Sequence, residues 1–336
     1  MRRVLLMITI FSLVPLLSGL PPARGQEAKE ANKPEAHGDP GPIGAVAACP
    51  CTFGPLIADT AAPIQTGKFS IQPSALTSFT GGVFTSNWRR VSANGNFTSL
   101  QLPVKFTYGP MKNMEVYVVA SYVHHWADHV DNPSPRGPRA ADFGGLGDIL
   151  TAVKYQFLEE SQAAPTLTGL FSVNFPTGHH QPENPGKLGA DHLGSGTYNF
   201  TAGLLASKYV NPFIFYGNLT YTVSTTTRFH QEIPLHGVVD RRLNVQDLLV
   251  LRLAAEYPLG GKGPWVALLE FYSAWETGRI FHPRPAASPG ALLGFLPGLE
   301  YVHSNRLAFA AGVAIDLAGK NRSFNYTPIV SMNYTF

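Results

Sequence analysis

The sequence predicts an all-β protein, a transmembrane antiparallel up-and-down β-barrel of about 12 strands. Three observations lead to this fold class: period-2 alternation of apolar residues, connections that alternate in length, and a low content of charge. Charged residues make up 14% of the chain, against about 25% in typical soluble domains. Past the N-terminal stretch there is no run of about 18 apolar residues, so the sequence predicts no membrane-spanning helix.

The stretch 324–336 carries the clearest alternation. Every second residue is apolar: Phe324, Tyr326, Pro328, Val330, Met332, Tyr334 and Phe336. The residues between them are polar, Ile329 excepted, which predicts a strand with one apolar and one polar face. An ordinary edge strand is the alternative. The terminal Phe resembles the C-terminal signature of bacterial outer-membrane barrels, which implies the barrel-assembly machinery as a partner.

Strand-like segments follow one another from Gly67 to the end. The predicted strands are 68–80, 96–108, 114–126, 146–158, 164–176, 196–208, 212–226, 244–257, 264–277, 291–303, 306–318 and 324–336. Short connections fall at 109–113, 159–163, 209–211, 258–263 and 304–305. The long ones fall at 81–95, 127–145, 177–195, 227–243 and 278–290, with a shorter last one at 319–323. Outer-membrane barrels show this pattern, with short periplasmic turns and long extracellular loops.

Two further segments are predicted ahead of the barrel. Arg2 and Arg3 precede an apolar run that ends near Leu20, and a polar switch follows at Gln26. This pattern predicts a secretory signal peptide over 1–25, with a membrane anchor as the alternative. Residues 26–66 lack any period and are rich in Ala, Pro and Gly, so we expect a flexible periplasmic segment, with a short plug-like piece around Phe53–Ile57. The barrel then occupies 67–336.

Several short motifs carry a family resemblance. Gly145-Leu146-Gly147-Asp148 leads into Lys154-Tyr155-Gln156-Phe157, and Phe175-Pro176-Thr177-Gly178 precedes Leu193-Gly194-Ser195-Gly196-Thr197. Together with residues 55–59 and 67–69, these motifs resemble the "MetA-pathway of phenol degradation" family over about 55–336. The resemblance implies an outer-membrane barrel that transports aromatic or other hydrophobic compounds.

Charged residues at inward positions are the first candidates for a site. They are Lys105, Glu115, Asp148, Lys154, Arg252, Glu256, Glu270, Glu276, Glu300, Arg306 and Asp316. Charges inside a barrel must be paired or hydrated. They therefore form either a pore lining that selects permeants or an ion-pair network that fills the lumen. Barrels of about eight strands are filled and those of 16–18 are open, so a barrel of intermediate size favours a narrow pore.

Histidines and cysteines are the second candidates. His125, His129, His179 and His180 are predicted at the outer rim, where imidazoles could bind a transition metal. Their spacing has diagnostic value on a helix but not on strands and loops, so solvated loop histidines are favoured and no metal or cofactor is predicted. Cys49 and Cys51 flank one proline. They could form a strained disulfide, part of a soft-metal site or an unremarkable loop pair.

The leading functional hypothesis is passive passage of small, hydrophobic or aromatic solutes across the bacterial outer membrane. A surface barrel that acts through its extracellular loops is one alternative, and a lipid-modifying enzyme is another. The chain contains no Gly-x-Ser-x-Gly elbow and no His-x-Ser pair, so no catalytic residue is predicted. The net charge of +3 is scattered, which argues against nucleic-acid binding. The expected partners are outer-membrane lipid, the permeant and the assembly machinery.

Overall fold

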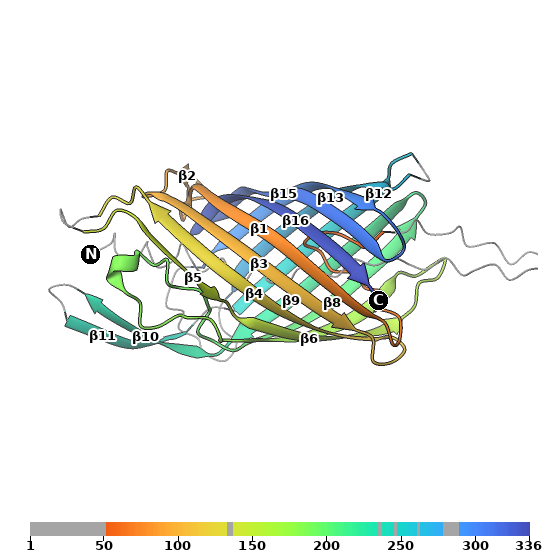
Figure 1. Ribbon diagram of the computed structural model, residues 1–336, viewed down its shortest axis with the longest axis horizontal. Coiled ribbons are helices and arrows are strands. Elements are labelled where there is room, and N and C mark those ends of the chain that lie inside the picture. The colour runs from red at the N-terminus through yellow and green to blue at the C-terminus, as the bar shows by residue number, and fades with distance from the viewer. Residues whose placement is uncertain (1–51, 133–136, 234–236, 245–246, 261–262, 278–288) are drawn as a thin grey trace, which may run out of the picture.

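The computed structural model describes residues 52–132, 137–233, 237–244, 247–260, 263–277 and 289–336, and it shows a closed antiparallel 12-stranded barrel (Figure 1). The barrel closes because the first strand pairs with the last, Ser70 opposite Thr335. The twelve strands are β1 (Phe69–Phe84), β3 (Asn96–Tyr108), β4 (Met114–Asp128), β6 (Ile149–Leu158), β7 (Thr166–Phe175), β8 (Asn199–Val210), β9 (Phe213–Ser224), β12 (Asp247–Pro258), β13 (Trp265–Thr277), β14 (Ala291–Val302), β15 (Leu307–Lys320) and β16 (Arg322–Thr335). The predicted fold class is therefore confirmed.

Shorter strands lie in the segments that the sequence assigned to long loops. They are β2 (Arg90–Val91), β5 (Ala141–Leu146), β10 (Thr226–Ile233) and β11 (Gly237–Asn244). The first two pair with β1 and β4, and the last two form a hairpin of their own. Pairing continues beyond the barrel because extended strand ends present unsatisfied backbone groups. A 3-10 helix, η2, covers Pro185–Lys187.

The predicted strand 146–158 is interrupted. Its residues from Ile149 onward form β6, whereas Leu146 ends β5, most of which lies in the predicted connection 127–145; both strands pair with β4. Gly147 and Asp148 lie between them and belong to neither strand. Since β7 pairs with β6 but ends at Phe175, β5 has no second strand neighbour among the residues that the structure describes. The barrel wall is thus incomplete on one side at this end, where the loop 176–198 runs.

Alternate residues of each strand point to opposite sides of the wall. Exposed outward-facing side chains are large and apolar: Phe106, Tyr155, Phe171, Leu204, Phe215, Leu253, Phe271, Phe309 and Tyr326. Inward-facing positions of β4 are buried, among them Glu115, Tyr117 and His125. An apolar exterior and a polar interior are typical of a transmembrane barrel in lipid. Among the described residues no helix has both the length and the hydropathy needed to cross a membrane.

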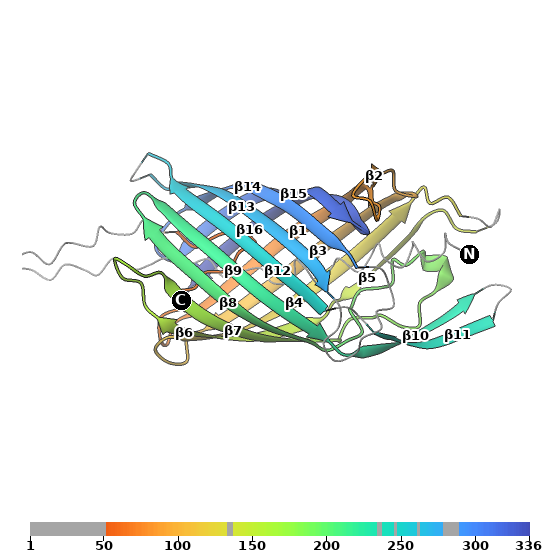
Figure 2. The same ribbon diagram turned by 180° about the vertical axis from the view of Figure 1, so that it is seen from behind.

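The long connections gather at one end of the barrel and the C-terminus lies at the other (Figures 1 and 2). We expect a protease added to intact cells to cut within 127–145, 177–195 or 227–243 and never at 109–113 or 209–211. Cleavage fragments identified by mass spectrometry check this prediction. Cleavage confined to the short turns would invert the orientation.

The last residue completes the closure. The Phe336 N–H donates to the Phe69 carbonyl at 2.8 Å, and its ring lies 5.7 Å from that of Phe69, centroid to centroid. Burial of one Phe side chain contributes roughly 1.5–3 kcal/mol to stability. We expect deletion of Phe336 to reduce the inserted fraction of the barrel by more than this loss of stability accounts for. Heat-modifiable gel mobility measures insertion, with Phe271→Ala as the control because this outward Phe is on β13, which pairs with β12 and β14 and not with the last strand. Equal losses for both variants would contradict a special role for the last residue.

Candidate functional site in the barrel interior

Residues 52–66, hereafter the plug, lie inside the barrel at the end that carries the C-terminus. Phe53, Ala58 and Ala61 have no exposed surface, and Leu56 is 1% exposed. The sequence predicted a flexible periplasmic segment here, with a plug-like piece only at Phe53–Ile57. The structure instead holds the plug against the inner wall from Thr52 to Ile64, with Gln65 and Thr66 exposed. The signal peptide, Cys49 and Cys51 lie outside the described residues.

Two glutamates of the wall hold the first half of the plug by its backbone. Glu270 of β13 accepts from the N–H groups of Leu56 and Ala58 at 2.5 and 2.7 Å, and from that of Ile57 at 3.0 Å. Glu300 of β14 accepts from the Phe53 N–H at 2.8 Å. Three consecutive backbone donors thus converge on one carboxylate, and hydrogen bonds to a charged acceptor are the stronger kind.

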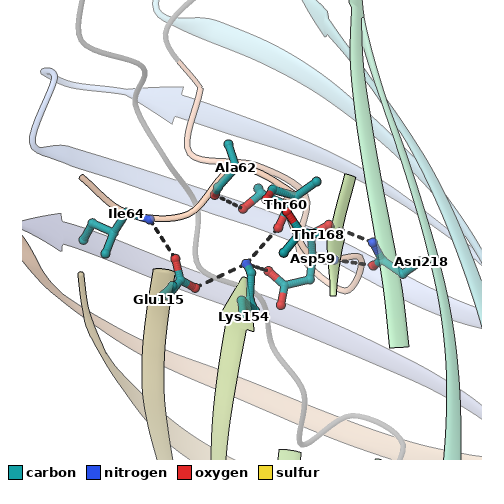
Figure 3. Close-up of polar contacts among 9 residues, drawn as sticks. Asp59, Thr60, Ala62, Ile64, Glu115, Lys154, Thr168 and Asn218 are labelled. Carbon is teal, nitrogen blue, oxygen red and sulfur yellow. Dashed lines mark hydrogen bonds and ion pairs between the residues drawn. The ribbon is translucent and has the colours of Figure 1, made fainter. Parts of the chain in front are cut away.

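A buried lysine anchors the centre of the plug (Figure 3). Lys154 Nζ lies 2.9 Å from Asp59 Oδ1, 3.2 Å from Glu115 Oε1 and 2.8 Å from the Thr60 carbonyl oxygen. Neither the Lys154 nor the Glu115 side chain has exposed surface. The other Glu115 oxygen accepts from the Ile64 N–H at 2.9 Å. Because this cation is surrounded by two carboxylates and a carbonyl, its burial is compensated.

Uncharged polar residues complete the attachment, and sequence reasoning missed them. Asn218 of β9 accepts from the Asp59 N–H at 2.5 Å and donates to the Asp59 carbonyl at 2.8 Å. Thr168 of β7 donates to the Ala61 carbonyl, and Thr52 donates to Glu300 at 2.5 Å. The inward positions of Asn218 and Thr168 follow from strand alternation. Their contacts do not, because sequence alone leaves the plug without a partner.

The remaining predicted interior charges have partners of their own. Lys105 lies 3.6 Å from the centroid of the Tyr117 ring, and Glu256 accepts from Tyr216 at 2.9 Å. Glu276 pairs with Arg322, and Asp316 accepts from Tyr272 at 2.8 Å. Positions on the inward side also include Arg252 of β12. Arg306 lies in the exposed turn before β15 and does not face the interior, because the strand begins one residue later than the sequence suggested.

Asp148 occupies the gap between β5 and β6 and holds the loop 176–198. One of its carboxylate oxygens accepts from Asn174 Nδ2, Ser195 N–H and Ser195 Oγ at 2.8, 2.8 and 2.7 Å. The other accepts from the Gly178 N–H at 3.0 Å. The Gly-Asp, Pro-Thr-Gly and Gly-Ser-Gly motifs, distant in sequence, therefore meet at one carboxylate. Gly194 leaves no room for a side chain there, since an added Cβ would lie 2.4 Å from Asp148 Oδ1.

The loop held by Asp148 packs over the outer end of the interior. Leu188 contacts the buried cluster of Phe97, Ala127 and Val130, and Leu193 is 3% exposed. The interior is therefore covered by the plug from one end and partly by this loop from the other.

The histidines lie in and around the same loop. His179 Nδ1 lies 2.7 Å from the Asp191 carbonyl, and burial lowers the pKa of His180 from its ordinary 6.5. His125 is buried on β4, whereas His129 is exposed beside Asp128. Within the part of the chain that the structure describes, no three His, Cys, Asp or Glu side chains are arranged to hold a metal ion.

Apolar side chains occupy part of the inner wall beneath the plug. Leu56 and Ile57 pack into a buried cluster with Leu76, Val266, Leu268, Leu296, Ala314 and Ile329. A second inward cluster lies nearer the opposite end and comprises Phe84, Val250, Ala274 and Leu292. The interior thus combines charged anchors with apolar surface, most of it on β12–β15.

The fold and the interior together define a class: an outer-membrane β-barrel whose lumen is occupied by its own N-terminal segment. Residues 112–328 match the family described as "MetA-pathway of phenol degradation", and the chain belongs to this family.

Comparison with solved structures places the fold among known barrels. The COG4313 outer membrane channel from Pseudomonas putida F1 is similar, with a TM-score of 0.63 and 12% identity over 82% of this chain and 98% of that one. The translocator domain of autotransporter NalP from Neisseria meningitidis gives 0.47 at 13% identity, over 81% and 90% of the two chains. The Ralstonia pickettii toluene transporter TbuX gives 0.42 at 10% identity, over 81% and 90%. At these identities the first likeness shows a shared fold.

Proposed function

We propose that this barrel gives small apolar solutes, hydrophobic or aromatic, a passive route across the outer membrane. The observation that carries the proposal is the apolar surface on the inward side of β13–β16, where Val266, Leu268, Leu296 and Ile329 lie beneath the plug. A water-filled pore is lined by polar groups. Inward-facing aliphatic clusters instead match solutes that leave water readily.

The comparisons with known proteins also support passage of small apolar solutes. The family's description names phenol degradation, and the COG4313 protein is titled an outer membrane channel. A purely structural or adhesive barrel has no need of apolar surface facing its interior, which weakens that alternative. A lipid-modifying activity would require a nucleophile activated by a neighbouring base, and we propose none.

Solute entry into cells tests this proposal. Uptake of radiolabelled toluene and phenol is measured in cells that carry the protein and in cells that carry an unrelated barrel of the same strand number. We expect faster uptake of both aromatics with this protein. In liposome swelling we expect little passage of a sugar of similar size, because the plug fills one end of the lumen. Equal aromatic uptake in the two strains would overturn the proposal.

A parallel measurement addresses the enzyme alternative. Purified protein is incubated with radiolabelled phospholipid, and the products are separated by thin-layer chromatography. We expect no turnover above that of a heat-denatured sample. Release of labelled fatty acid or lysolipid would replace passage with catalysis as the function.

A further inference from the structure

The apolar surface beneath the plug, hereafter the inner patch, consists of Leu76, Val266, Leu268, Leu296, Ala314 and Ile329. It belongs to the inner wall of β1 and β13–β16 and is buried by Leu56 and Ile57. Those two side chains come from a segment that is in no strand. They can therefore leave the patch without breaking any strand ladder of the barrel.

The second apolar cluster differs in this respect. Phe84, Val250, Ala274 and Leu292 all belong to strands of the wall, and Phe324 of β16 packs against them. Phe84 and Phe324 are in edge-to-face contact with their ring centroids 5.9 Å apart. Every side chain that covers this cluster is fixed by strand pairing. Of these two clusters, the inner patch alone is covered by side chains of the plug.

One glycine of the wall, Gly312, provides room for Leu56 of the plug. A Cβ added to Gly312 would lie 2.9 Å from Leu56 Cδ1 and 2.7 Å from Leu296 Cδ2. A Cβ added to Gly298 would instead meet groups of the wall itself, the Ala311 carbonyl oxygen at 3.0 Å, Leu296 Cδ2 at 3.3 Å and Leu268 Cβ at 3.4 Å. The missing side chain of Gly312 therefore lets Leu56 approach the wall closely, and an apolar group of similar size fits the same place.

We propose that the inner patch is the binding site for the apolar solute, and that Leu56 and Ile57 of the plug occupy it in the resting barrel. Solute and plug then compete for one surface. This inference rests on the proposed function, since it names where the permeant binds. Competition also explains how a barrel closed by its own segment admits a solute.

The polar contacts of the plug fit an occupant that can be displaced. Glu270 and Glu300 hold it through backbone N–H groups, which water can replace when the plug withdraws. The pair between Lys154 and Asp59, 2.9 Å apart, breaks when the plug withdraws, whereas the pair between Lys154 and Glu115, 3.2 Å apart, joins two residues of the wall and continues to compensate the lysine. Plug and solute binding to the inner patch are thermodynamically linked. The plug lowers the affinity of the inner patch for the solute, and bound solute lowers the affinity of the inner patch for the plug by the same factor.

Accessibility of the plug provides the test. Ala58→Cys is introduced into the full chain with Cys49→Ser and Cys51→Ser, and a membrane-impermeant maleimide is added to the protein in nanodiscs. Since Ala58 has no exposed surface, we expect slow labelling of the resting barrel. Toluene is added at ten times its dissociation constant for the plug-free barrel. At this concentration it increases the plug-free population by roughly tenfold, so the labelling rate should rise by the same factor. Ala61→Cys, at a second fully buried position, repeats the measurement if the first variant does not fold.

A matched pair of variants locates the site. Leu268 in the inner patch and Leu292 in the second cluster are both 3% exposed and both face inward. We expect Leu268→Asn to raise labelling without toluene, because it weakens the packing of Leu56 and Ile57. At the same toluene concentration it should reduce the roughly tenfold response to about twofold, since losing one buried aliphatic contact surface raises the dissociation constant by about tenfold. Leu292→Asn should leave both the labelling without toluene and the response to toluene unchanged. The reverse result would place the solute in the second cluster and overturn the inference.

Variants of the anchors supply an independent readout. Glu270→Gln weakens the hold on the plug and should raise labelling without toluene, whereas Glu276→Gln should not, since Glu276 pairs with Arg322 instead. Heat-modifiable mobility confirms that each variant is folded.

The combined outcomes separate the two proposals. If toluene does not change the labelling rate but aromatic uptake persists, the shared site is wrong and the proposed function still holds. Toluene-dependent labelling without any uptake supports the binding site and removes the proposed passage.

Discussion

Replacing Lys154 with Leu is expected to destabilise the barrel by about 3–5 kcal/mol, because the variant leaves buried carboxylates without their cation. Lys154 has no exposed surface and contacts Asp59 and Glu115 at 2.9 and 3.2 Å. Leucine has a similar volume, so packing changes little and the electrostatic loss dominates. Urea unfolding in detergent or lipid, followed by tryptophan fluorescence, measures the change.

The neighbouring residue provides the control for orientation. Val153 points to the opposite side of β6, so Val153→Lys places a charge toward lipid and should cost roughly 2–4 kcal/mol near the bilayer midplane. Lys154→Leu and Val153→Lys should therefore both destabilise. If Lys154→Leu stabilises while Val153→Lys is tolerated, β6 is one residue out of phase and the interior assignment fails.

Replacing Asp148 with Ala is expected to release the loop 176–198 while the barrel stays folded. The carboxylate accepts from Asn174, Gly178 and Ser195, and hydrogen bonds to a charged group contribute about 1.5–3 kcal/mol each. Losing them together should raise local opening by on the order of a hundredfold or more. The initial rate of protease cleavage within the loop measures this opening, with the rate at 227–243 as the internal reference.

Asp142→Ala serves as the matched control for Asp148. Asp142 lies on β5 at the same end of the barrel, but its side chain is 64% exposed and its partner is His124 at 3.3 Å. We expect almost no change in loop cleavage from this variant, because exposed ion pairs contribute little. Asp148→Asn keeps one acceptor oxygen and should give an intermediate rate. Equal cleavage in all three variants would show that the loop is held by its apolar contacts alone.

Much of the barrel could be predicted because period-2 alternation is a local property. Which face of β6 carries Lys154 and which carries Val153 follows from strand geometry once the exterior is known to be apolar. The strand that ends on Phe336 was predicted by the same reasoning, and the structure pairs it with β1. Local rules were weakest at strand ends, where Arg306 falls in a turn rather than on the inner wall.

The interruption at Gly147 and Asp148 was not predicted, although both residues belonged to a recognised motif. Alternation continues through the motif, so nothing local distinguishes a break from a continuous strand. The break depends on Ser195 and Gly178, which reach Asp148 only after the loop has folded back. Convergence of three sequence-distant motifs on one carboxylate is a tertiary property.

The sequence by itself determined the barrel and, Arg306 excepted, the side of the wall to which the predicted interior charges belong, because both follow from strand geometry. It also required those charges to be paired or hydrated, because an unpaired buried charge is costly. Only the tertiary structure decided that residues 52–66 lie inside the lumen. The plug has no periodic pattern, and its attachment uses backbone N–H groups that any residue but proline possesses. Its position depends on acceptors on strands far along the chain, Glu270 and Asn218 among them. These acceptors surround the plug only in the closed barrel, so the sequence alone could not predict where the plug lies.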